Sequence, residues 1–338
     1  MTPADDRVAT FLDLVEGRRL DDAGRLAMRQ VESGDRPQDV IRTLLAAAQA
    51  EVGARWHRAA WTVAHEHQAT AVVDAALHGV VSAVQPRRHR GTLAVVCAEG
   101  DWHTLPSRMA AELLRLDGWE VMFLGGSLPA PDLSPWLQEA RPDAVVVTCS
   151  LPTFGRGVLN IAAAGARIGI PVVAGGRGLG ADASRAAALG AGWAGDLTVL
   201  ATALAAPTPS VDPDARTARL AAGDQLLLRR ADIVGAAMWE LGLSWPPMHT
   251  LTTRQLSRTA EDFGRILDVV AAATLMDDTG VFTEFVEWLT VLLTARGIAP
   301  EVVPLSLRAL TVAMPPELEK AHAVLAAGTD GTVRWEIP

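Results

Sequence analysis

Cysteine is scarce in this sequence of 338 residues, which contains only Cys97 and Cys149. Both end apolar runs, so we expect two buried free thiols, no disulfide framework and a reducing, cytoplasmic compartment. Long apolar runs are missing as well. No segment approaches the roughly 18 apolar residues of a membrane span, and the N-terminus lacks the apolar core of a signal peptide. The sequence therefore predicts no membrane association.

Positive charge is also in short supply. There are 30 Lys and Arg residues against 39 Asp and Glu residues, a formal net charge of −9. Nucleic-acid binding needs a basic surface that neutralises phosphates, so this balance and the lack of a helix-turn-helix pattern argue against direct nucleic-acid binding. The one basic cluster, residues 87–90, is interpreted as a solvated linker.

What the sequence does contain is a series of short, strongly apolar runs in its middle third. They alternate with amphipathic helical stretches and cover residues 92–97, 120–124, 143–149 and 171–174. This alternation predicts a doubly wound, Rossmann-like parallel sheet over residues 90–205, covered by helices on both faces. In such sheets ligands bind at the carboxyl ends of the strands.

The flanking regions are expected to be helical, which gives a multidomain α plus α/β fold. Residues 1–86 read as a helical bundle, and the proline-rich stretch 206–214 as a linker. Residues 215–338 predict an all-helical domain. Its expected helices cover residues 216–243, 250–276 and 281–296, with one or two more in 304–327. That domain contains no serine–histidine–acid set, phosphate-binding loop or metal-ligand cluster.

Polar residues and glycines follow three of the predicted strands. Asp101 and His103 come after the first, and a carboxylate behind an imidazole is a typical support for a metal-bound histidine. The segment Ser150-Leu151-Pro152-Thr153 follows the third strand, and Gly175-Gly176 follows the fourth. Alone, Asp-x-His could be a loop histidine beside an acid; its position at the predicted ligand-binding edge favours a cofactor site.

These residues resemble the cobalamin-binding domains of methionine synthase, the mutases and the light-responsive regulators, whose pattern is Asp-x-His-x-x-Gly, Ser-x-Leu/Thr and Gly-Gly. The resemblance implies that His103 is the lower axial ligand of cobalt, with Asp101 behind it. It also implies that the nucleotide tail of cobalamin lies along a second set of residues: Ser150, Leu151, Thr153, Gly175 and Gly176. One departure is Pro106, where the family has glycine. Because proline fixes φ and lacks an N–H, we expect it to alter the tail geometry or the ligation by His103.

A second group of residues lies upstream, in the helical bundle. Trp56-His57 is followed ten residues later by Glu66-His67, a spacing that resembles methionine-synthase-like caps and most of all the CarH-type photoreceptors that bind adenosylcobalamin. The resemblance implies that Trp56 and Glu66 lie beside the adenosyl group. It implies that His57 can take the upper axial position on cobalt after light, with His67 a pocket residue of unassigned role. Each residue alone also fits core packing or a solvated helix.

The C-terminal region carries Arg254 and Arg258, four residues apart and therefore on one helix face, in a region rich in tryptophan and phenylalanine. Arginine pairs with aromatic walls suit a tetrapyrrole bearing two propionates, although solvated arginines over an aromatic core fit the residues better. A lone histidine, His249 or His322, could instead ligate haem. The domain order resembles the photocobilins, which implies a globin-like domain holding biliverdin. Binding would be non-covalent, since no cysteine follows Cys149.

Together the resemblances imply an adenosylcobalamin-dependent photoreceptor in which light cleaves the Co–C bond and repacks the cap. It would not itself be an enzyme, and it would act on an unidentified output protein; the alanine-rich cap helices favour a homodimer. Two alternatives stay open. One is a corrinoid methyl carrier of a methyltransferase system, and the other is a cobalamin-sensing antirepressor whose extra domain docks a partner.

Overall fold

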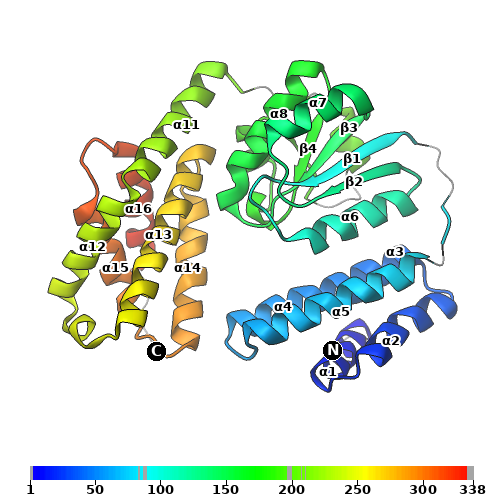
Figure 1. Cartoon of the computed structure of the whole chain (residues 1–338), viewed down its shortest axis with the longest axis horizontal. Coiled ribbons are helices and arrows are strands. Elements are labelled where there is room, and N and C mark those ends of the chain that lie inside the picture. Colours follow the sequence, from blue (N-terminus) through cyan, green and yellow to red (C-terminus); the bar gives the residue numbers. More distant parts are fainter. Residues whose placement is uncertain are drawn as a thin grey trace.

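The computed structural model describes residues 3–82, 84–86, 90–195, 200–206, 208–209 and 211–332. Its N-terminal part is a helical cap, drawn in blue in Figure 1. The cap consists of α1 (Pro3–Glu16), α2 (Leu20–Glu32), α3 (Pro37–Val40), the π-helical segment η1 (Ile41–Ala46), α4 (Ala47–His57) and α5 (Val63–Ser82). Segments α3, η1 and α4 follow one another without a break. The helical bundle expected from the sequence is therefore present.

The middle of the chain is a parallel sheet with strand order β2-β1-β3-β4-β5. The strands are β1 (Thr92–Cys97), β2 (Glu120–Gly125), β3 (Ala144–Thr148), β4 (Val172–Gly175) and β5 (Gly192–Trp193). They alternate with α6 (Thr104–Leu116), α7 (Ala130–Ala140), α8 (Gly155–Ile168), α9 (Ser184–Ala188) and α10 (Leu200–Ala205). The predicted Rossmann-like fold is confirmed; β5 was not predicted, because two residues leave no apolar run to recognise. The strand order reverses between β1 and β3, which is where such folds bind ligands.

The C-terminal domain is all-helical among its described residues. It contains α11 (Pro213–Leu228), α12 (Arg230–Ser244), η5 (Pro246–Thr250), α13 (Thr253–Met276), α14 (Gly280–Ala295), α15 (Val302–Ala313) and α16 (Glu319–Thr332). The single helix expected over 216–243 was wrong, because the chain breaks at Arg229. Helix α11 packs on α13, whereas α12 packs chiefly on α15, and one straight helix would not follow both. No glycine or proline marks this break.

Two other expectations concern linkers. The stretch 206–214 was expected to be a linker, and α11 already begins at Pro213. Pro207 and Ser210 lie outside the described residues, as do residues 87–89 of the basic cluster. Both cysteines are free and buried, as predicted. Within the described residues, no helix is both long and apolar enough to cross a membrane.

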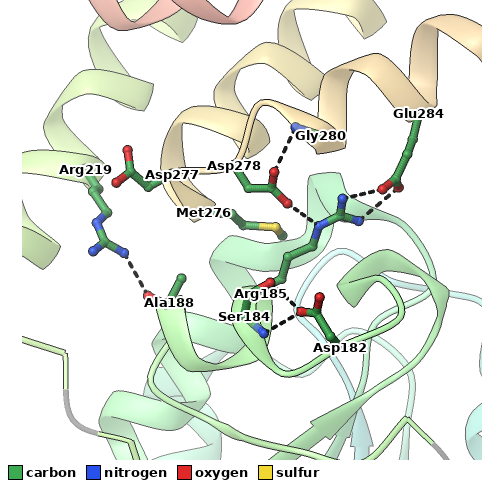
Figure 2. A pocket seen from close by; sticks show the side chains of 10 residues that line it. All are labelled: Asp182, Ser184, Arg185, Ala188, Arg219, Met276, Asp277, Asp278, Gly280 and Glu284. Atoms are coloured by element: carbon green, nitrogen blue, oxygen red, sulfur yellow. Dashed lines mark hydrogen bonds and ion pairs between the residues drawn. The ribbon is translucent and has the colours of Figure 1, made fainter.

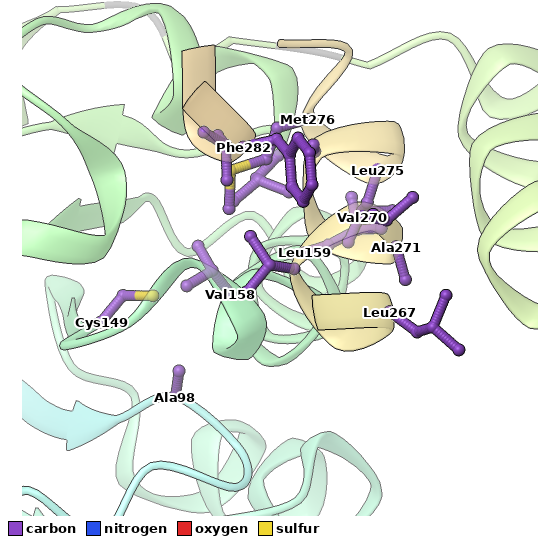
Figure 3. Close-up of a cluster of buried hydrophobic side chains, with 14 of the residues drawn as sticks. Ala98, Cys149, Val158, Leu159, Leu267, Val270, Ala271, Leu275, Met276 and Phe282 are labelled. Carbon is purple, nitrogen blue, oxygen red and sulfur yellow. The ribbon is translucent and has the colours of Figure 1, made fainter. Parts of the chain in front are cut away.

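The C-terminal domain and the sheet domain share one hydrophobic core. Figure 3 shows Val158 and Leu159 of α8 beside Val270 and Ala271 of α13, with Phe282 of α14 close to them. The cap has a separate core, which includes one face of α6. The C-terminal domain is therefore joined to the sheet by continuous packing, while the cap rests mainly on α6.

A buried arginine adds a polar link between the same two domains (Figure 2). Arg185 of α9 donates to Asp278 Oδ2 over 2.7 Å, and its two terminal nitrogens donate to the carboxylate of Glu284 over 2.6 and 3.0 Å. A buried guanidinium needs such partners, because leaving it unpaired costs several kcal/mol, on the order of 3–5. These bonds fix the start of α14 against the sheet domain.

Candidate cofactor site

The loop between β1 and α6 holds the Asp-x-His pair in a defined geometry. Asp101 is 0% exposed. Its Oδ1 accepts hydrogen bonds from His103 Nδ1 at 2.8 Å and from the His103 backbone N–H at 2.9 Å. Its Oδ2 accepts from the backbone N–H of Ser150 at 2.8 Å, so the carboxylate also ties the loop after β1 to the loop after β3. The predicted pairing of Asp101 with His103 is therefore present in the structure.

These contacts shift the pKa values of both Asp101 and His103. Burial opposes ionisation of Asp101, but the hydrogen bonds from His103 and Ser150 outweigh it and hold the pKa of Asp101 below its usual value. The bond to Asp101 raises the pKa of His103; burial opposes this rise, and the charges of Asp101 and Glu66 add to it. The imidazole is thus made more basic by the carboxylate behind it.

The same geometry leaves His103 available to a metal. Its side chain is 57% exposed, and its Nδ1 is bonded to Asp101, so Nε2 is the nitrogen that could ligate a metal. Among the described residues there is no cluster of three or more His, Cys, Asp or Glu side chains that could hold a metal ion by itself. The donor set fits a metal that brings its other ligands with it, as cobalt does in a corrin.

Pro106 does not disturb this arrangement. It lies in the first turn of α6, two residues after Thr104, where backbone N–H groups have no partner within the helix. A proline there removes a donor that the helix does not use. The hydrogen bonds between His103 and Asp101 are intact. Pro106 therefore leaves the pairing of His103 with Asp101 intact, and its predicted effect on the tail geometry or on ligation by His103 stays a prediction.

The predicted tail-binding residues gather at the carboxyl ends of β3 and β4. Ser150 and Leu151 follow β3, and Thr153 lies in the short helix η2 (Pro152–Phe154). A Cβ atom on Gly175 would lie 2.5 Å from the carbonyl oxygen of Ala194. On Gly176, which has φ of 111°, it would lie 2.4 Å from the carbonyl oxygen of Cys149. These glycines therefore let the loop after β4 pack directly against neighbouring backbone.

Two residues of the site were missed by the sequence-based prediction. Trp102, between Asp101 and His103, is 73% exposed. The hydroxyl of Ser127, after β2, accepts a hydrogen bond from the backbone N–H of Gly100 at 3.1 Å. The backbone N–H of Ser127 donates to the backbone carbonyl oxygen of Asp101 at 3.0 Å. The segment Gly125-Gly126-Ser127 at a strand end was the available signal.

On the cap side, Glu66 of α5 is close enough to His103 for its charge to help raise the pKa of that histidine. Glu66 accepts a hydrogen bond from Thr70 at 3.3 Å, and His67 Nε2 lies 3.4 Å from its other oxygen. The imidazole of His67 itself is exposed. The structure therefore brings Glu66 toward His103 and leaves His67 at the surface.

Trp56 and His57 end α4 and lie against the C-terminal domain, a contact that the sequence did not suggest. The ring of His57 stacks on Trp288 of α14, with ring centroids 5.1 Å apart and an angle of 3° between the planes. Trp56 lies 6.2 Å from the same ring. The upper-side residues expected for the cofactor are thus in contact with α14.

The C-terminal domain contains a cavity of about 350 Å³. Its walls combine apolar side chains with two arginines, and they include Leu241, Trp245, Arg258, Phe263, Leu289 and Arg296. Of the arginine pair predicted to hold a bilin, Arg258 lines this cavity, whereas Arg254 is exposed and does not. Arg296 was not considered from the sequence, because it lies at the far end of α14.

Comparison with known proteins agrees with the two-part site. Residues 9–78 and residues 91–202 each match a B12 binding domain. The HTH-type transcriptional repressor CarH of Myxococcus xanthus is 36% identical over 110 residues, which are 32% of this chain and 36% of the repressor. Trimethylamine corrinoid protein 1 of Methanosarcina mazei is 22% identical over 135 residues, covering 39% of this chain and 62% of that protein. The chain thus spans less than two thirds of the length of either relative.

Among solved structures, the monomethylamine corrinoid protein of Methanosarcina barkeri superposes with a TM-score of 0.50 at 16% identity. The match covers 57% of this chain and 94% of that one, and it shows a shared fold. The helical cap and the Rossmann-like domain therefore define a cobalamin-binding protein. Its cofactor is a cobalamin or another corrinoid.

Proposed function

We propose that this protein is an adenosylcobalamin-dependent light sensor. When bound, adenosylcobalamin supplies a cobalt–carbon bond that light can cleave. His103 is proposed to hold cobalt from below, with Asp101 fixing its orientation, while Trp56 and Glu66 line the upper side. The proposed signal is a repacking of α4 and α5 when the space beside Trp56 and Glu66 empties.

The observation behind this proposal is that predicted cofactor residues lie on both sides of the boundary between the cap and the sheet domain. The cap supplies Glu66 and the sheet domain supplies His103, and the two are close enough to interact electrostatically. The order Trp56-His57 then Glu66 is the feature that resembles the CarH-type photoreceptors. A light sensor needs a cap that can pass a change at the cofactor to another part of the protein, and the contact of α4 with α14 offers such a route.

The test is absorption spectroscopy of protein reconstituted with adenosylcobalamin in darkness, before and after green light. We expect an alkylcobalamin spectrum that light converts irreversibly to a hydroxo or bis-histidine form. Protein reconstituted with methylcobalamin serves as the comparison. A bound adenosylcobalamin spectrum that survives illumination would count against a sensor.

A corrinoid methyl carrier is the second candidate, and the fold match that covers 94% of a monomethylamine corrinoid protein favours it. That likeness concerns the cap and the sheet domain, which both functions need. The C-terminal domain and its contact with His57 have no evident role in carrying a methyl group. Methyl transfer between bound methylcobalamin and a partner methyltransferase would support this candidate. The antirepressor alternative differs from the sensor only in responding to cobalamin rather than to light.

For the C-terminal domain we propose non-covalent binding of biliverdin. The cavity has the size of small-molecule sites and combines apolar walls with Arg258 and Arg296, which suit propionates. Arg258→Gln should weaken biliverdin uptake about tenfold or more, measured by its far-red absorption. Arg254→Gln, which changes an exposed arginine on the same helix, is the matched control. Equal biliverdin uptake by the parent protein and both variants would show that this cavity is not the biliverdin site.

The proposal includes self-association and action on a partner protein, with no enzymatic activity of its own. The large exposed apolar side chains of α12, Trp239 and Leu243, are one turn apart, and a Cβ on Gly235 would meet nothing within 4 Å. Residues four apart share a helix face, so this face carries both a protruding indole and an open position. Two copies of this face could pack their indoles against each other's open positions, which would suit a two-fold homodimer.

A further inference from the structure

The end of the cap helix α4 is held by α14 through a direct hydrogen bond from His57. Nε2 of His57 lies 2.8 Å from the backbone carbonyl oxygen of Trp288. A carbonyl oxygen only accepts, so His57 must donate, and Nε2 carries the proton in this contact. The stacked indole of Trp288 holds the same ring from one face. His57 therefore has its reactive nitrogen directed into the C-terminal domain.

Arg296 makes a second attachment at the same point. It donates to the backbone carbonyl of His57 at 3.3 Å and to that of Trp56 at 3.2 Å, and its guanidinium lies 5.0 Å from the centre of the Trp56 ring. It also donates to the carbonyl of Leu292 at 2.9 Å. The last carbonyls of a helix lack partners within the helix and carry partial negative charge. One arginine thus caps the carboxyl ends of both α4 and α14.

We infer that α14 is a latch for the cap and that Trp288 and Arg296 are positioning residues that keep His57 away from the cofactor. The C-terminal domain shares its core with the sheet domain, so the latch is anchored to the same unit that carries His103. The cap, with its own core, is the part that the latch restrains. This inference rests on the proposed function only in that a cobalamin is the competitor for His57.

Competition for one nitrogen couples the two domains. His57 Nε2 cannot donate to Trp288 and ligate a metal at the same time. Whatever strengthens the bond to α14 must weaken ligation, and ligation must in turn release α14, because coupling between two sites is reciprocal. Arg296 also lines the cavity of the C-terminal domain, so an anionic occupant there competes for the guanidinium that caps α4.

The latch can be tested first without any cofactor, by hydrogen exchange of the full-length protein. Arg296→Gln and Trp288→Ala should each speed amide exchange in residues 54–60 about tenfold, while exchange in β1 and β3 stays slow. Arg308→Gln changes an exposed arginine of α15 in the same domain and serves as the control. Unchanged exchange at the end of α4 in both variants would overturn the inference. Slow exchange in the strands shows that a variant has folded.

The second arm uses protein loaded with hydroxocobalamin in darkness, whose absorption distinguishes water from a second histidine on cobalt. Both variants should raise the fraction of the bis-histidine form severalfold over the parent protein, and His57→Ala should abolish that form in every background. Loaded variants that match the parent would contradict the latch. Failure of the parent to bind hydroxocobalamin would instead contradict the proposed function, leaving the exchange result to decide on the latch.

Discussion

At the scale of single residues, the site depends on one buried carboxylate that serves two loops. The carboxylate of Asp101 accepts three hydrogen bonds, two from His103 and one from Ser150, and the residue is 0% exposed. An ionised carboxyl group is tolerated at such a position only because donors replace the water it loses. Asp101 thus orients the imidazole and joins the β1 and β3 loops at the point where the strand order reverses.

Asp101→Asn should lower the pKa of His103, because the bond to Asp101 is the main cause of its rise. The pKa of His103 should be measured by NMR titration of its imidazole. Asp182→Asn, which changes an acid in another loop of the sheet domain, serves as the control. A raised histidine pKa adds stability that is fully present below the unfolded value of 6.5 and is lost as pH rises through the folded value. The stability difference between parent and Asp101→Asn should therefore shrink above pH 6.5. A difference that grows with pH would contradict this assignment.

At the scale of elements, β1, β3 and β4 could be predicted from the sequence because burial on both faces selects continuous apolar runs. The Asp-x-His loop and the Gly-Gly loop were readable because both must follow a strand. The break at Arg229 could not be predicted from the sequence, because it arises from the different helices that α11 and α12 pack against. The contact of His57 with Trp288 could not be predicted either, because the residues are 231 positions apart and no pattern links them.

Gly176→Ala should destabilise the protein by about 3 kcal/mol or more, because it combines a backbone conformation reserved for glycine with a clash against the Cys149 carbonyl. Gly125→Ala is the matched control, since it shares a positive φ of 81° but has open space around the added atom. Its cost should be about 1–2 kcal/mol. Chemical denaturation measures both; equal costs would show that the close approach at Gly176 adds nothing.

Thr252→Ala tests the start of α13, which begins at Thr253, three residues later than the sequence predicted. Thr252 accepts from the backbone N–H of Gln255, and the Gln255 side chain accepts from the Thr252 backbone N–H, so each satisfies a donor at the helix end. Loss of this cap should lower the free energy of unfolding by about 1 kcal/mol. Thr259→Ala, at a half-buried position further along α13 that caps no helix end, should cost less.

At the scale of the whole molecule, the sheet and the C-terminal domain form one packed unit, and the cap is held against it by α6 and by the end of α14. The predicted cofactor residues Glu66 and His103 therefore lie on opposite sides of the boundary between the cap and this unit. A cap that moves would change the environment of His57 and Arg296 without unfolding either core. The sequence predicted three domains but not which two are fused.

We expect the full-length protein to form a homodimer through the exposed face of α12. Trp239→Glu should shift the full-length protein from dimer to monomer in light scattering, because it places a charge in the proposed apolar interface. Trp102→Glu is the control, since Trp102 is as exposed as Trp239, at 73% against 70%, but lies in the sheet domain. A parent protein that is monomeric at high concentration would remove α12 as the dimer surface.

The proposed ligation of cobalt by His103 can be tested by electron paramagnetic resonance of the reduced cobalt(II) form. The axial nitrogen splits the cobalt lines, and the splitting reveals which isotope is bound. In protein labelled with ¹⁵N and loaded with unlabelled cobalamin, we predict the doublet of a ¹⁵N ligand, lost in His103→Ala. A triplet from the cofactor's own ¹⁴N base, unchanged by labelling and by the substitution, would contradict the assignment of His103.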